Sequence, residues 1–493
     1  MRLTRIVATL GPASLEPETI SDLIDAGVDV FRCNFAHGTP ERHKAACEAV
    51  REAGRRTGRD VALMQELCGP KIRIEEIEKG GVELIPGQET VVTTAKLSGN
   101  AMRFSCSYKS LPQDVRPGDR IFINDGNIEL EVLKTAGDDV YCKVRRGGML
   151  ASHASVNLPG VKISDPSVTP QDLKDLAAGQ DMGFDYVSLS FVRSAEDVLK
   201  VRRVIEKWDN PPLLLAKIER PEALEAIDAI IAAADGIVIA RGDLAVELAP
   251  ERVPVVQQDL IRRANAADKL SIVATQMLES MKNSLTPTRS EVNDVAIAVY
   301  EGADAVMLSA ETSIGSYPVA AVQMVAKVAA EVEKPLADNH PQWNWKRTRV
   351  THPLGDAVSN AAYGIYKALK ATAIVAYTHS GRTGLYLSKC RPFVHLVVFT
   401  RSREVARKMR LFWGVEPIYC SNINTAQDLR YYATEHLREN NLCAGTDNII
   451  IVSGNPFGII DHSNTLEVTQ LSGNASVVDL SDLSAKRKGG KKK

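Results

Sequence analysis

Short apolar runs alternate with helical patterns about eight times along the first two thirds of this chain, and this alternation limits the possible folds more than any other feature. Such runs are typical of strands that are buried on both faces of a parallel sheet. The runs occupy residues 4–10, 28–34, 61–67, 186–191, 213–218, 236–240, 271–275 and 305–309. Apolar residues at helical spacing occur in 40–57, 195–208, 221–234 and 253–267. The alternation predicts an α/β fold built on a (β/α)₈ TIM barrel.

One connection interrupts this rhythm. Between residues 71 and 164 the helical period is lost, and runs of strand character alternate with turn sequences such as Pro117-Gly118-Asp119. We expect this segment to form a small β-barrel domain that is inserted into the TIM barrel as a lid. The TIM barrel itself is then built from residues 1–70 and 165–340.

The last third of the chain is organised differently. A polar stretch with Trp and Pro at 333–350 predicts a linker. Residues 350–475 alternate apolar runs with helical stretches again, which predicts an open α/β domain at the C-terminus. The basic segment 476–493 predicts a flexible tail, for which attraction to nucleic acid is a minority alternative.

Composition argues against several classes of protein. The 493 residues include 60 basic and 61 acidic side chains, so no overall field draws the protein to nucleic acid or to an anionic membrane. The sequence offers no window of roughly 20 apolar residues and no signal-peptide core, which predicts a protein without a membrane partner. Its eight cysteines contain no Cys-x-x-Cys pair. We therefore expect reduced thiols and a cytoplasmic location.

The predicted strands end in polar residues, and the chemistry of a TIM barrel lies at these carboxyl ends. Here they bring cations, carboxylates and hydroxyls to one mouth, a mixture that suits a phosphorylated acid and a divalent metal. The residues are Arg32, Asn34, Glu66, Lys71, Arg73, Ser190, Lys217, Glu219, Arg241, Gly242, Asp243, Thr275, Gln276, Ser309 and Glu311.

Two neighbouring strand ends predict a metal site. Lys217 and Glu219 are two positions apart and point to the same side of their strand, and Asp243 follows the next strand. Two carboxylates with few other protein ligands suit Mg²⁺, or Mn²⁺, with substrate oxygens and water completing the shell. Lys217 would act as a fixed positive charge where anionic charge moves between oxygens. Backbone N–H groups around Gly242 suit a carboxylate.

Arg32 and Arg73 carry planar guanidinium groups that suit phosphate, so the chain has the components of phosphoryl transfer. The same residues stand in motifs that resemble those of the pyruvate kinase family along nearly the whole chain. The motifs are IVATLGPAS (6–14), RCNFAHG (32–38), GPKIR (69–73), NLPG (157–160), SFVR (190–193), AKIE (216–219), ARGDL (240–244), ATQMLES (274–280), PTR (287–289) and MLSAET (307–312). The order of the expected domains is also the family's order.

The resemblance implies a phosphotransferase of glycolysis that moves the phosphoryl group of phosphoenolpyruvate to ADP and yields pyruvate and ATP. By analogy, Glu219 and Asp243 bind magnesium, and Lys217 stabilises the transferring phosphoryl group and the enolate oxygen. The Gly242 and Asp243 amides hold the substrate carboxylate, and Thr275 contacts the substrate and belongs to a proton relay.

The resemblance also implies a nucleotide side of the site. Arg32 binds the substrate phosphate, while Arg73 faces the nucleotide together with Asn34 and His37, although a helix cap explains His37 equally well. The lid closes over the mouth and excludes water. Members of the family are typically homotetramers.

Several positions depart from the family pattern. Members that use potassium line its site with Asn, Ser, Asp and often Thr, where this chain has Asn34, Ala36, Glu66 and Leu67. Lys71 stands where those members carry Glu, and its ammonium can take the electrostatic role of the ion. We therefore expect activity without added potassium.

Two alanines are further departures. Ala154 stands where the family has a nucleotide-contacting Lys, which suggests weaker ADP binding or help from His153. Ala245 replaces a Gly after Asp243-Leu244 and adds a methyl group near the carboxylate-binding turn.

A loop in the C-terminal domain is a candidate effector site. It follows a strand and precedes a helix, a layout that can cradle phosphate, and its residues are Thr378, Ser380, Gly381, Arg382 and Thr383. It resembles the loop with which many family members bind a sugar phosphate, which implies allosteric regulation. A simple strand-to-helix turn explains the loop equally well.

Two other functions stay open at this point. A metal-dependent lyase that acts on phosphoenolpyruvate or pyruvate would share Lys217 and the paired carboxylates, but it would need neither the lid nor the C-terminal domain. A degenerate relative that only senses a sugar phosphate would explain Ala36, Glu66, Ala154 and Ala245. Formation of pyruvate from phosphoenolpyruvate and ADP separates these readings.

Overall fold

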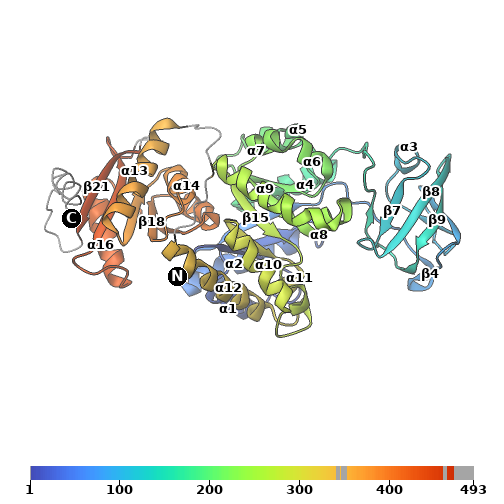
Figure 1. The fold of residues 1–493 in the computed structure, drawn as a ribbon, viewed down its shortest axis with the longest axis horizontal. Coiled ribbons are helices and arrows are strands. Elements are labelled where there is room, and N and C mark those ends of the chain that lie inside the picture. The colour runs from blue at the N-terminus through green and yellow to red at the C-terminus, as the bar shows by residue number, and fades with distance from the viewer. Residues whose placement is uncertain (1, 340–344, 346–351, 459–462, 471–493) are drawn as a thin grey trace, which may run out of the picture.

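The structure is a computed structural model that describes residues 2–339, 345, 352–458 and 463–470. Eight parallel strands close a barrel at the centre of the molecule in the order β1-β16-β15-β14-β13-β12-β3-β2 (Figure 1). The strands are β1 (Arg5–Thr9), β2 (Val30–Asn34), β3 (Ala62–Leu67), β12 (Tyr186–Leu189), β13 (Leu213–Ile218), β14 (Gly236–Ala240), β15 (Leu270–Ala274) and β16 (Ala305–Leu308). The predicted (β/α)₈ fold is confirmed.

Helices surround the barrel and bury the outward faces of its strands. Val187 and Val273 on the strands pack in one cluster with Ile20 and Val198 on the helices, and all four side chains are fully buried. The helices are α1 (Pro17–Ala26), α2 (Pro40–Thr57), α4 (Pro170–Gln180), α5 (Ala195–Ile205), α6 (Pro221–Glu225), α7 (Ile227–Ala233), α8 (Arg241–Glu247), α9 (Val253–Ala266), α10 (Arg289–Tyr300), α11 (Ala310–Ser313) and α12 (Pro318–Asn339). This double-sided burial explains why the strands read as nearly continuous apolar runs.

The lid lies between β3 and α4 in the chain and stands at one end of the elongated molecule (Figure 1). A six-stranded sheet of order β11-β7-β8-β9-β5-β6 and a two-stranded sheet of β10 and β4 build it. Its elements are β4 (Val82–Leu84), β5 (Glu89–Thr93), β6 (Arg103–Ser105), α3 (Leu111–Asp114), β7 (Arg120–Ile123), β8 (Ile128–Ala136), β9 (Asp139–Arg146), β10 (Gly148–Leu150) and β11 (Val156–Asn157). The lid has its own apolar core, which includes Phe104, Ile121 and Leu130.

The C-terminal domain stands at the opposite end and contains a sheet of order β19-β18-β17-β20-β21 (Figure 1). Among the described strand pairs of this sheet, only β20–β21 is antiparallel. The elements are α13 (Pro353–Leu369), β17 (Ala373–Tyr377), α14 (Arg382–Lys389), β18 (His395–Thr400), α15 (Arg403–Lys408), β19 (Val415–Tyr419), α16 (Ala426–Glu439), β20 (Asn448–Gly454) and β21 (Ser463–Gln470). An open α/β domain is confirmed.

The structure corrects the predicted linker. Residues 333–339 belong to helix α12, although the sequence suggested that they connect two domains. Glu333 is buried and accepts hydrogen bonds from the backbone N–H groups of Leu3 and Thr4, each at 2.7 Å. These contacts join residues more than 300 positions apart and stabilise the last turns of α12. The local polarity alone had predicted that the helix ends earlier. The predicted tail, 476–493, lies outside the described residues.

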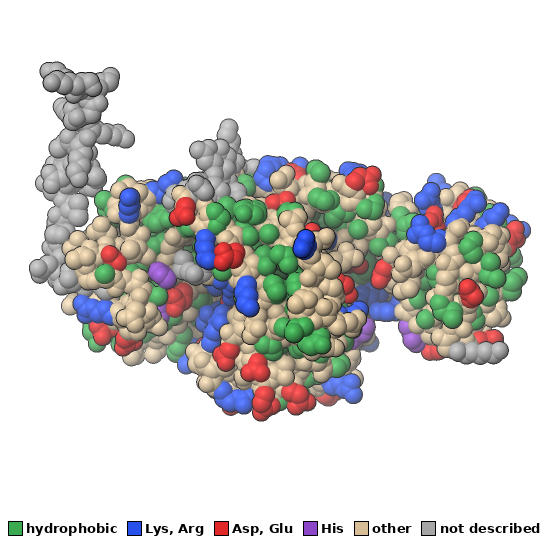
Figure 2. Space-filling view, turned by 60° about the horizontal axis from the view of Figure 1, so that its bottom comes forward, with side chains coloured by type: hydrophobic (Ala, Val, Ile, Leu, Met, Phe, Trp, Pro, Cys, Tyr) green, Lys and Arg blue, Asp and Glu red, His purple; other side chains and the backbone are tan. Residues whose placement is uncertain are grey.

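Surface charge agrees with the composition. Lys and Arg side chains are interspersed with Asp and Glu on the face shown in Figure 2. Among the described helices, none is both long and apolar enough to cross a membrane.

Candidate active site

Lys217 lies at the centre of a buried charge cluster at the carboxyl ends of the barrel strands. Its ammonium lies 2.7 Å from Glu219 Oε1 and 3.2 Å from Glu66 Oε1, and 3.5 Å from Ser190 Oγ. The exposed fraction is 8% for Lys217 and 2% for Glu219. Burial lowers the pKa of the Lys217 ammonium, but the carboxylates of Glu219 and Glu66 outweigh burial and raise it above its ordinary value. Lys217 therefore stays charged.

Glu66 is a second centre of this cluster. Its carboxylate accepts hydrogen bonds from both Nε, at 2.7 Å, and Nη2 of Arg32, while Arg32 Nη1 donates to Thr9 Oγ1 at 2.9 Å. Burial raises the pKa of Glu66, but Arg32 and Lys217 lower it to about 2. A guanidinium has five N–H groups, so Arg32 keeps about two for a ligand. Glu66 was expected at the mouth and as a changed potassium ligand, but its ion pairs with both Arg32 and Lys217 were not predicted.

The signal for this role was available but weak. Arg32 and Glu66 stand at the ends of adjacent strands, and the register pairs Asn34 with Glu66. An acidic residue beside an arginine at neighbouring strand ends indicates an ion pair once the strand order is known.

Asp243 completes the carboxylate pair. Helix α8 begins directly after β14, which places Asp243 in its first turn. The described residues provide no hydrogen bond or ion pair to this carboxylate within ordinary distances. Burial, followed by the negative charge of Glu219, raises the pKa of Asp243 to about 7, while Lys217 and Lys71 act in the opposite direction. Glu219 and Asp243 are therefore near each other and only partly compensated.

This partial compensation fits a divalent cation. A dication between the buried carboxylate of Glu219 and the half-buried carboxylate of Asp243 would remove their repulsion, and hard oxygen ligands suit Mg²⁺. No group of three or more His, Cys, Asp or Glu side chains suited to a metal forms among the described residues. Glu219 and Asp243 are the two carboxylates that such an ion could take from the protein.

Thr275 stands at a strained turn beside this pair. Thr275 and Gln276 have φ angles of 67° and 54°, a region that β-branched residues in particular rarely adopt. Thr275 Oγ1 accepts a hydrogen bond from the Gly242 N–H at 2.7 Å and donates to Ala274 O at 2.6 Å. A Cβ added to Gly242 would lie 3.3 Å from this hydroxyl oxygen. The turn thus holds Thr275 against the first residues of α8, and the Gly242 amide donates to Thr275 here.

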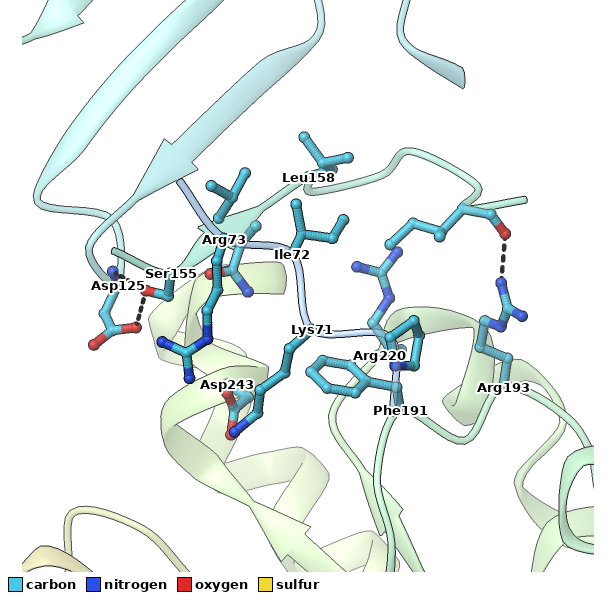
Figure 3. A pocket seen from close by; sticks show the side chains of 14 residues that line it. Lys71, Ile72, Arg73, Asp125, Ser155, Leu158, Phe191, Arg193, Arg220 and Asp243 are labelled. Carbon is cyan, nitrogen blue, oxygen red and sulfur yellow. Dashed lines mark hydrogen bonds between the residues drawn. The ribbon is translucent and has the colours of Figure 1, made fainter. Parts of the chain in front are cut away.

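A cleft lies between the lid and the barrel mouth (Figure 3). Lys71 and Asp243 lie together at its barrel side, and Arg73 reaches down from the lid. Arg73 Nη1 donates to His153 O at 2.9 Å. Burial and then the charge of Lys217 lower the pKa of Lys71. Two cations therefore face the open space above Asp243.

Asn34 and His37 lie on the rim at the end of β2. Asn34 Oδ1 accepts a hydrogen bond from the Ala36 N–H at 3.1 Å, and the His37 side chain is exposed. Partial burial, followed by Lys71 and Arg73, lowers the pKa of His37. The alternative that His37 caps a helix is wrong, because Thr39 is the cap of α2.

The structure shows what surrounds Ala154 and Ala245, the two alanines that depart from the family pattern. His153, which the sequence offered as help for the missing Lys at Ala154, pairs with Glu76 at 3.0 Å, and both of these side chains are largely exposed. Ala154 packs against the lid core, and Ala245 is half-buried in α8.

The candidate effector loop lies far along the chain from this site. Gly381 has a φ of 89° and precedes helix α14, and its N–H donates to Thr378 Oγ1 at 3.0 Å. Thr383 Oγ1 contacts Ser463 Oγ at 2.6 Å, and Arg382 Nη1 contacts His352 Nε2 at 2.8 Å. The strand-turn-helix layout predicted here is present.

Two family models match the chain. The model described as pyruvate kinase, barrel domain, matches residues 1–322, and the model described as pyruvate kinase, alpha/beta domain, matches residues 356–469. Together they cover most of the barrel and of the C-terminal domain.

Individual relatives agree with these models. A pyruvate kinase from Agrobacterium vitis is 38% identical over 470 residues, which cover 95% of this chain and 98% of the relative. A pyruvate kinase from Geobacillus stearothermophilus is 38% identical over 478 residues, 96% of this chain and 81% of the relative. The crystal structure of a pyruvate kinase from Cryptosporidium parvum superposes with a TM-score of 0.88 at 33% identity, covering 95% of this chain and 96% of that one. The chain belongs to the pyruvate kinase family.

Proposed function

We propose that this protein transfers the phosphoryl group of phosphoenolpyruvate to ADP and so produces pyruvate and ATP in glycolysis. One observation carries the proposal. Lys217 is held charged between Glu219 and Glu66 at the barrel mouth, beside the under-compensated carboxylate of Asp243 and beneath the lid. A fixed cation beside two carboxylates that suit a dication is what a phosphoryl group in transfer requires.

Each residue around Lys217 has a role that follows from its position. Lys217 faces the phosphoryl group and the enolate oxygen, and the remaining N–H groups of Arg32 face the substrate phosphate. The first turn of α8, with Gly242 and Asp243, receives the substrate carboxylate at a helix N-terminus. Binding there requires the Gly242 amide to exchange its Thr275 hydroxyl for a substrate oxygen.

Thr275 suits the proton step. When the Gly242 amide turns to substrate, the Thr275 hydroxyl is released while the strained turn still holds it near the same point. A hydroxyl there can pass a proton towards the enolate carbon through hydrogen bonds.

Glu219 and Asp243 would hold the divalent ion, Mg²⁺ or Mn²⁺. Bound there, the ion neutralises charge that develops on the phosphoryl oxygens. The second oxygen of Glu219 accepts a hydrogen bond from the Phe191 N–H at 2.8 Å, which orients the carboxylate. Phe191 has a φ of 54°, so a strained backbone again serves a site residue.

The nucleotide is proposed to enter the cleft under the lid. Arg73 and Lys71 supply positive charge there, and Asn34 and His37 form the adjacent rim. Because Ala154 offers no ammonium group, binding of ADP rests mainly on Arg73.

Potassium is proposed to be dispensable. Lys71 lies close enough to Asp243 and Glu66 for their charges to act on one another. Its ammonium supplies one positive charge, as a monovalent ion would, while Ala36 and Leu67 offer no side-chain oxygen for an ion.

Regulation and assembly are proposed from the outer surfaces. The loop that contains Thr378 and Gly381 is a candidate site for a phosphorylated effector. Val255, Ile297 and Tyr300 are exposed by 69%, 37% and 48% on the neighbouring barrel helices α9 and α10, which supports a homotetramer with these faces in contact. All eight cysteines are free, which supports a cytoplasmic location.

The decisive experiment measures pyruvate and ATP together, from phosphoenolpyruvate, ADP and Mg²⁺, with Lys217→Met as the control. We expect equal amounts of both products from the wild-type protein and nearly none from the control. Consumption of phosphoenolpyruvate that does not depend on ADP would favour the lyase. Binding of a sugar phosphate without turnover would favour the sensor.

A further inference from the structure

Two connecting segments join the lid to the barrel, and the barrel holds each one differently. The outgoing segment contains Gly69, and the returning segment contains residues 161–167. In the outgoing segment, the Gly69 N–H donates to Asp172 Oδ1 at 2.9 Å. Gly69 has a φ of 66°, and a Cβ added there would lie 2.8 Å from Phe191 Cδ2. The outgoing segment is thus a tight turn that the backbone N–H of Gly69 fixes to the barrel.

Two arginines, Arg193 and Arg220, hold the returning segment. Arg193, labelled in Figure 3, donates to the carbonyl oxygen of Ile163, and it also donates to that of Asp165 at 2.8 Å and to Ser167 Oγ at 2.9 Å. All three acceptors lie in the returning segment. Arg193 therefore fixes this segment to the barrel.

Arg220 makes a different kind of connection. It follows β13 two residues beyond Ile218 and is only 4% exposed. Its Nη2 donates to Val161 O of the returning segment at 3.0 Å, and its Nη1 donates to Glu247 Oε1 at 2.7 Å. Glu247 is the last residue of α8, the helix whose first turn carries Asp243. One side chain therefore joins the lid to the helix that carries a proposed metal ligand.

The surroundings of this pair reinforce the link. Glu222 also contacts Arg220 Nη2 at 3.2 Å, and the lid residue Asn157 stabilises the charged form of Glu247. Arg220 Nε and Glu247 Oε2 are buried without a hydrogen-bond partner among the described residues. The pair thus retains a donor and an acceptor that can take new partners as the lid moves.

We propose that Arg220, together with Glu247, is a positioning pair that couples the posture of the lid to the orientation of α8. This proposal rests on the phosphoryl transfer proposed above. When the returning segment moves, its contact through Val161 O moves Arg220. Arg220 in turn moves Glu247 at the C-terminal end of α8. Closure of the lid and alignment of Asp243 then occur together, so that the site is complete only when water is excluded.

The test compares the full-length protein with four variants. Arg220→Met removes both contacts, and Arg220→Lys keeps only the charge. The double variant Arg220→Met with Glu247→Gln removes the link without leaving a carboxylate unpaired. Arg202→Met is the matched control, because Arg202 also bridges a carboxylate, Asp235 at 2.9 Å, and a carbonyl, Ala233 O at 3.0 Å, away from the lid.

Two measurements are made on each protein. The first is kcat and KM for both substrates, and we expect kcat/KM of Arg220→Met and of the double variant to fall by about 10- to 100-fold, since misplaced groups lose rate on this scale. Arg220→Lys should lie between these and the wild type, and Arg202→Met should match the wild type. The second is hydrogen exchange of residues 158–168, which should become about tenfold faster in the same two variants.

The outcomes separate the proposals. If the double variant regains wild-type kcat/KM, only charge compensation mattered and the positioning role is refuted. Faster exchange without any loss of kcat/KM would refute it too. If the wild type makes no pyruvate, the proposed function fails, yet the exchange comparison still decides whether Arg220 holds the lid.

Discussion

The two ends of the barrel both bury charged residues, but they pair them differently. At the mouth, Asp243 and Lys71 have no oppositely charged partner within 4.0 Å among the described residues. At the opposite end, where the strands begin, three buried aspartates each have at least two cationic partners. At the mouth, Asp243 and Lys71 can therefore pair with charges of bound ligands. At the opposite end, which we call the base of the barrel, the aspartates already pair with cations of the protein.

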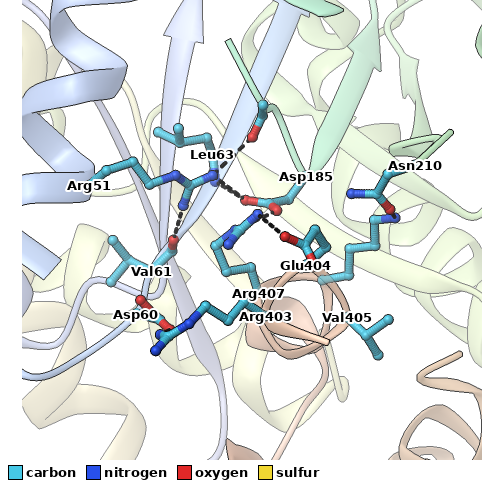
Figure 4. A network of polar contacts seen from close by, with 12 residues as sticks. Arg51, Asp60, Val61, Leu63, Asp185, Asn210, Arg403, Glu404, Val405 and Arg407 are labelled. Atoms are coloured by element: carbon cyan, nitrogen blue, oxygen red, sulfur yellow. Dashed lines mark hydrogen bonds and ion pairs between the residues drawn. The ribbon is translucent and has the colours of Figure 1, made fainter. Parts of the chain in front are cut away.

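Asp185 shows how the base is built (Figure 4). Its carboxylate pairs with Arg51 and with Arg407, each at 2.9 Å, and accepts a hydrogen bond from the Leu63 N–H. Arg51 belongs to barrel helix α2, and Arg407 belongs to α15 of the C-terminal domain. One aspartate thus ties the two domains together.

Asp29 and Asp304 repeat this pattern. Asp29 pairs with Arg2 at 2.8 Å and with Arg59 at 2.9 Å. Asp304, just before β16, pairs with Lys389 at 2.7 Å and with Arg391 at 2.9 Å, both from the C-terminal domain. These aspartates pair with cations from other parts of the chain and so hold the structure together, whereas at the mouth Asp243 and Lys71 have no oppositely charged partner within 4.0 Å among the described residues, in agreement with the division of labour in TIM barrels.

The largest effect that we predict is at the mouth. Lys217→Met should lower kcat by about 10³-fold, equivalent to about 4 kcal/mol, because a preorganised charge at the reacting group is lost. Arg32 still pairs with Glu66, but Glu219 loses its buried ion-pair partner, so a lower thermal unfolding midpoint should accompany the loss of kcat. Steady-state kinetics and calorimetry on the same preparation test both statements. A large loss of stability with near-normal kcat per folded molecule would break the comparison.

At the base we predict the reverse. Asp304→Asn should leave Lys389 and Arg391 buried without a carboxylate, and it should cost roughly 3 kcal/mol of unfolding free energy. Burial already lowers the pKa of Lys389 to about 8, against the raising effect of Asp304. Urea unfolding measures the loss, and kcat should stay near normal below the unfolding transition.

Asp259→Asn is the matched control for that experiment. Asp259 also pairs with two cations, Arg262 at 2.6 Å and Arg263 at 2.7 Å, but its side chain is 41% exposed. We expect a change of at most about 0.5 kcal/mol. Equal losses from the two variants would show that burial of the base network contributes nothing.

The sequence predicted the barrel and its mouth well for a physical reason. Doubly buried strands read as apolar runs, and polar residues at their carboxyl ends must share one face. Lys217, Glu219 and Asp243 were therefore predictable as neighbours.

Other features depend on contacts that no local pattern records. β19 and β21 are edge strands of the C-terminal sheet and were not predicted, and Pro417 inside β19 is tolerated only at such an edge. Helix 221–234 breaks into α6 and α7 around Ala226. The partners of Asp185 and Asp304 lie up to 222 residues away, so they emerge only when the domains are docked.

Acid should weaken the ion pairs of Asp29 at the end of the barrel where the strands begin. Burial raises the pKa of Asp29, but Arg2, Arg5 and Arg59 lower it to about 2, below its unfolded value of 3.8. A depressed pKa stabilises the folded state above the unfolded value and loses this effect as pH falls towards 2, a total of roughly 2 kcal/mol. In urea unfolding, the advantage of wild type over Asp29→Asn should therefore narrow as pH falls below about 5. An advantage that does not depend on pH would contradict the pairing.

The smallest effect should be that of potassium. Lys71 already supplies positive charge beside Asp243, so replacing an inert cation with potassium at constant ionic strength should change the wild-type rate less than about twofold. Lys71→Glu removes that charge and restores the residue of potassium-dependent members. We expect its rate to be low without potassium and to rise when the ion is added. A strong response of the wild type would show that the mouth, like the base, needs a partner that Lys71 does not provide.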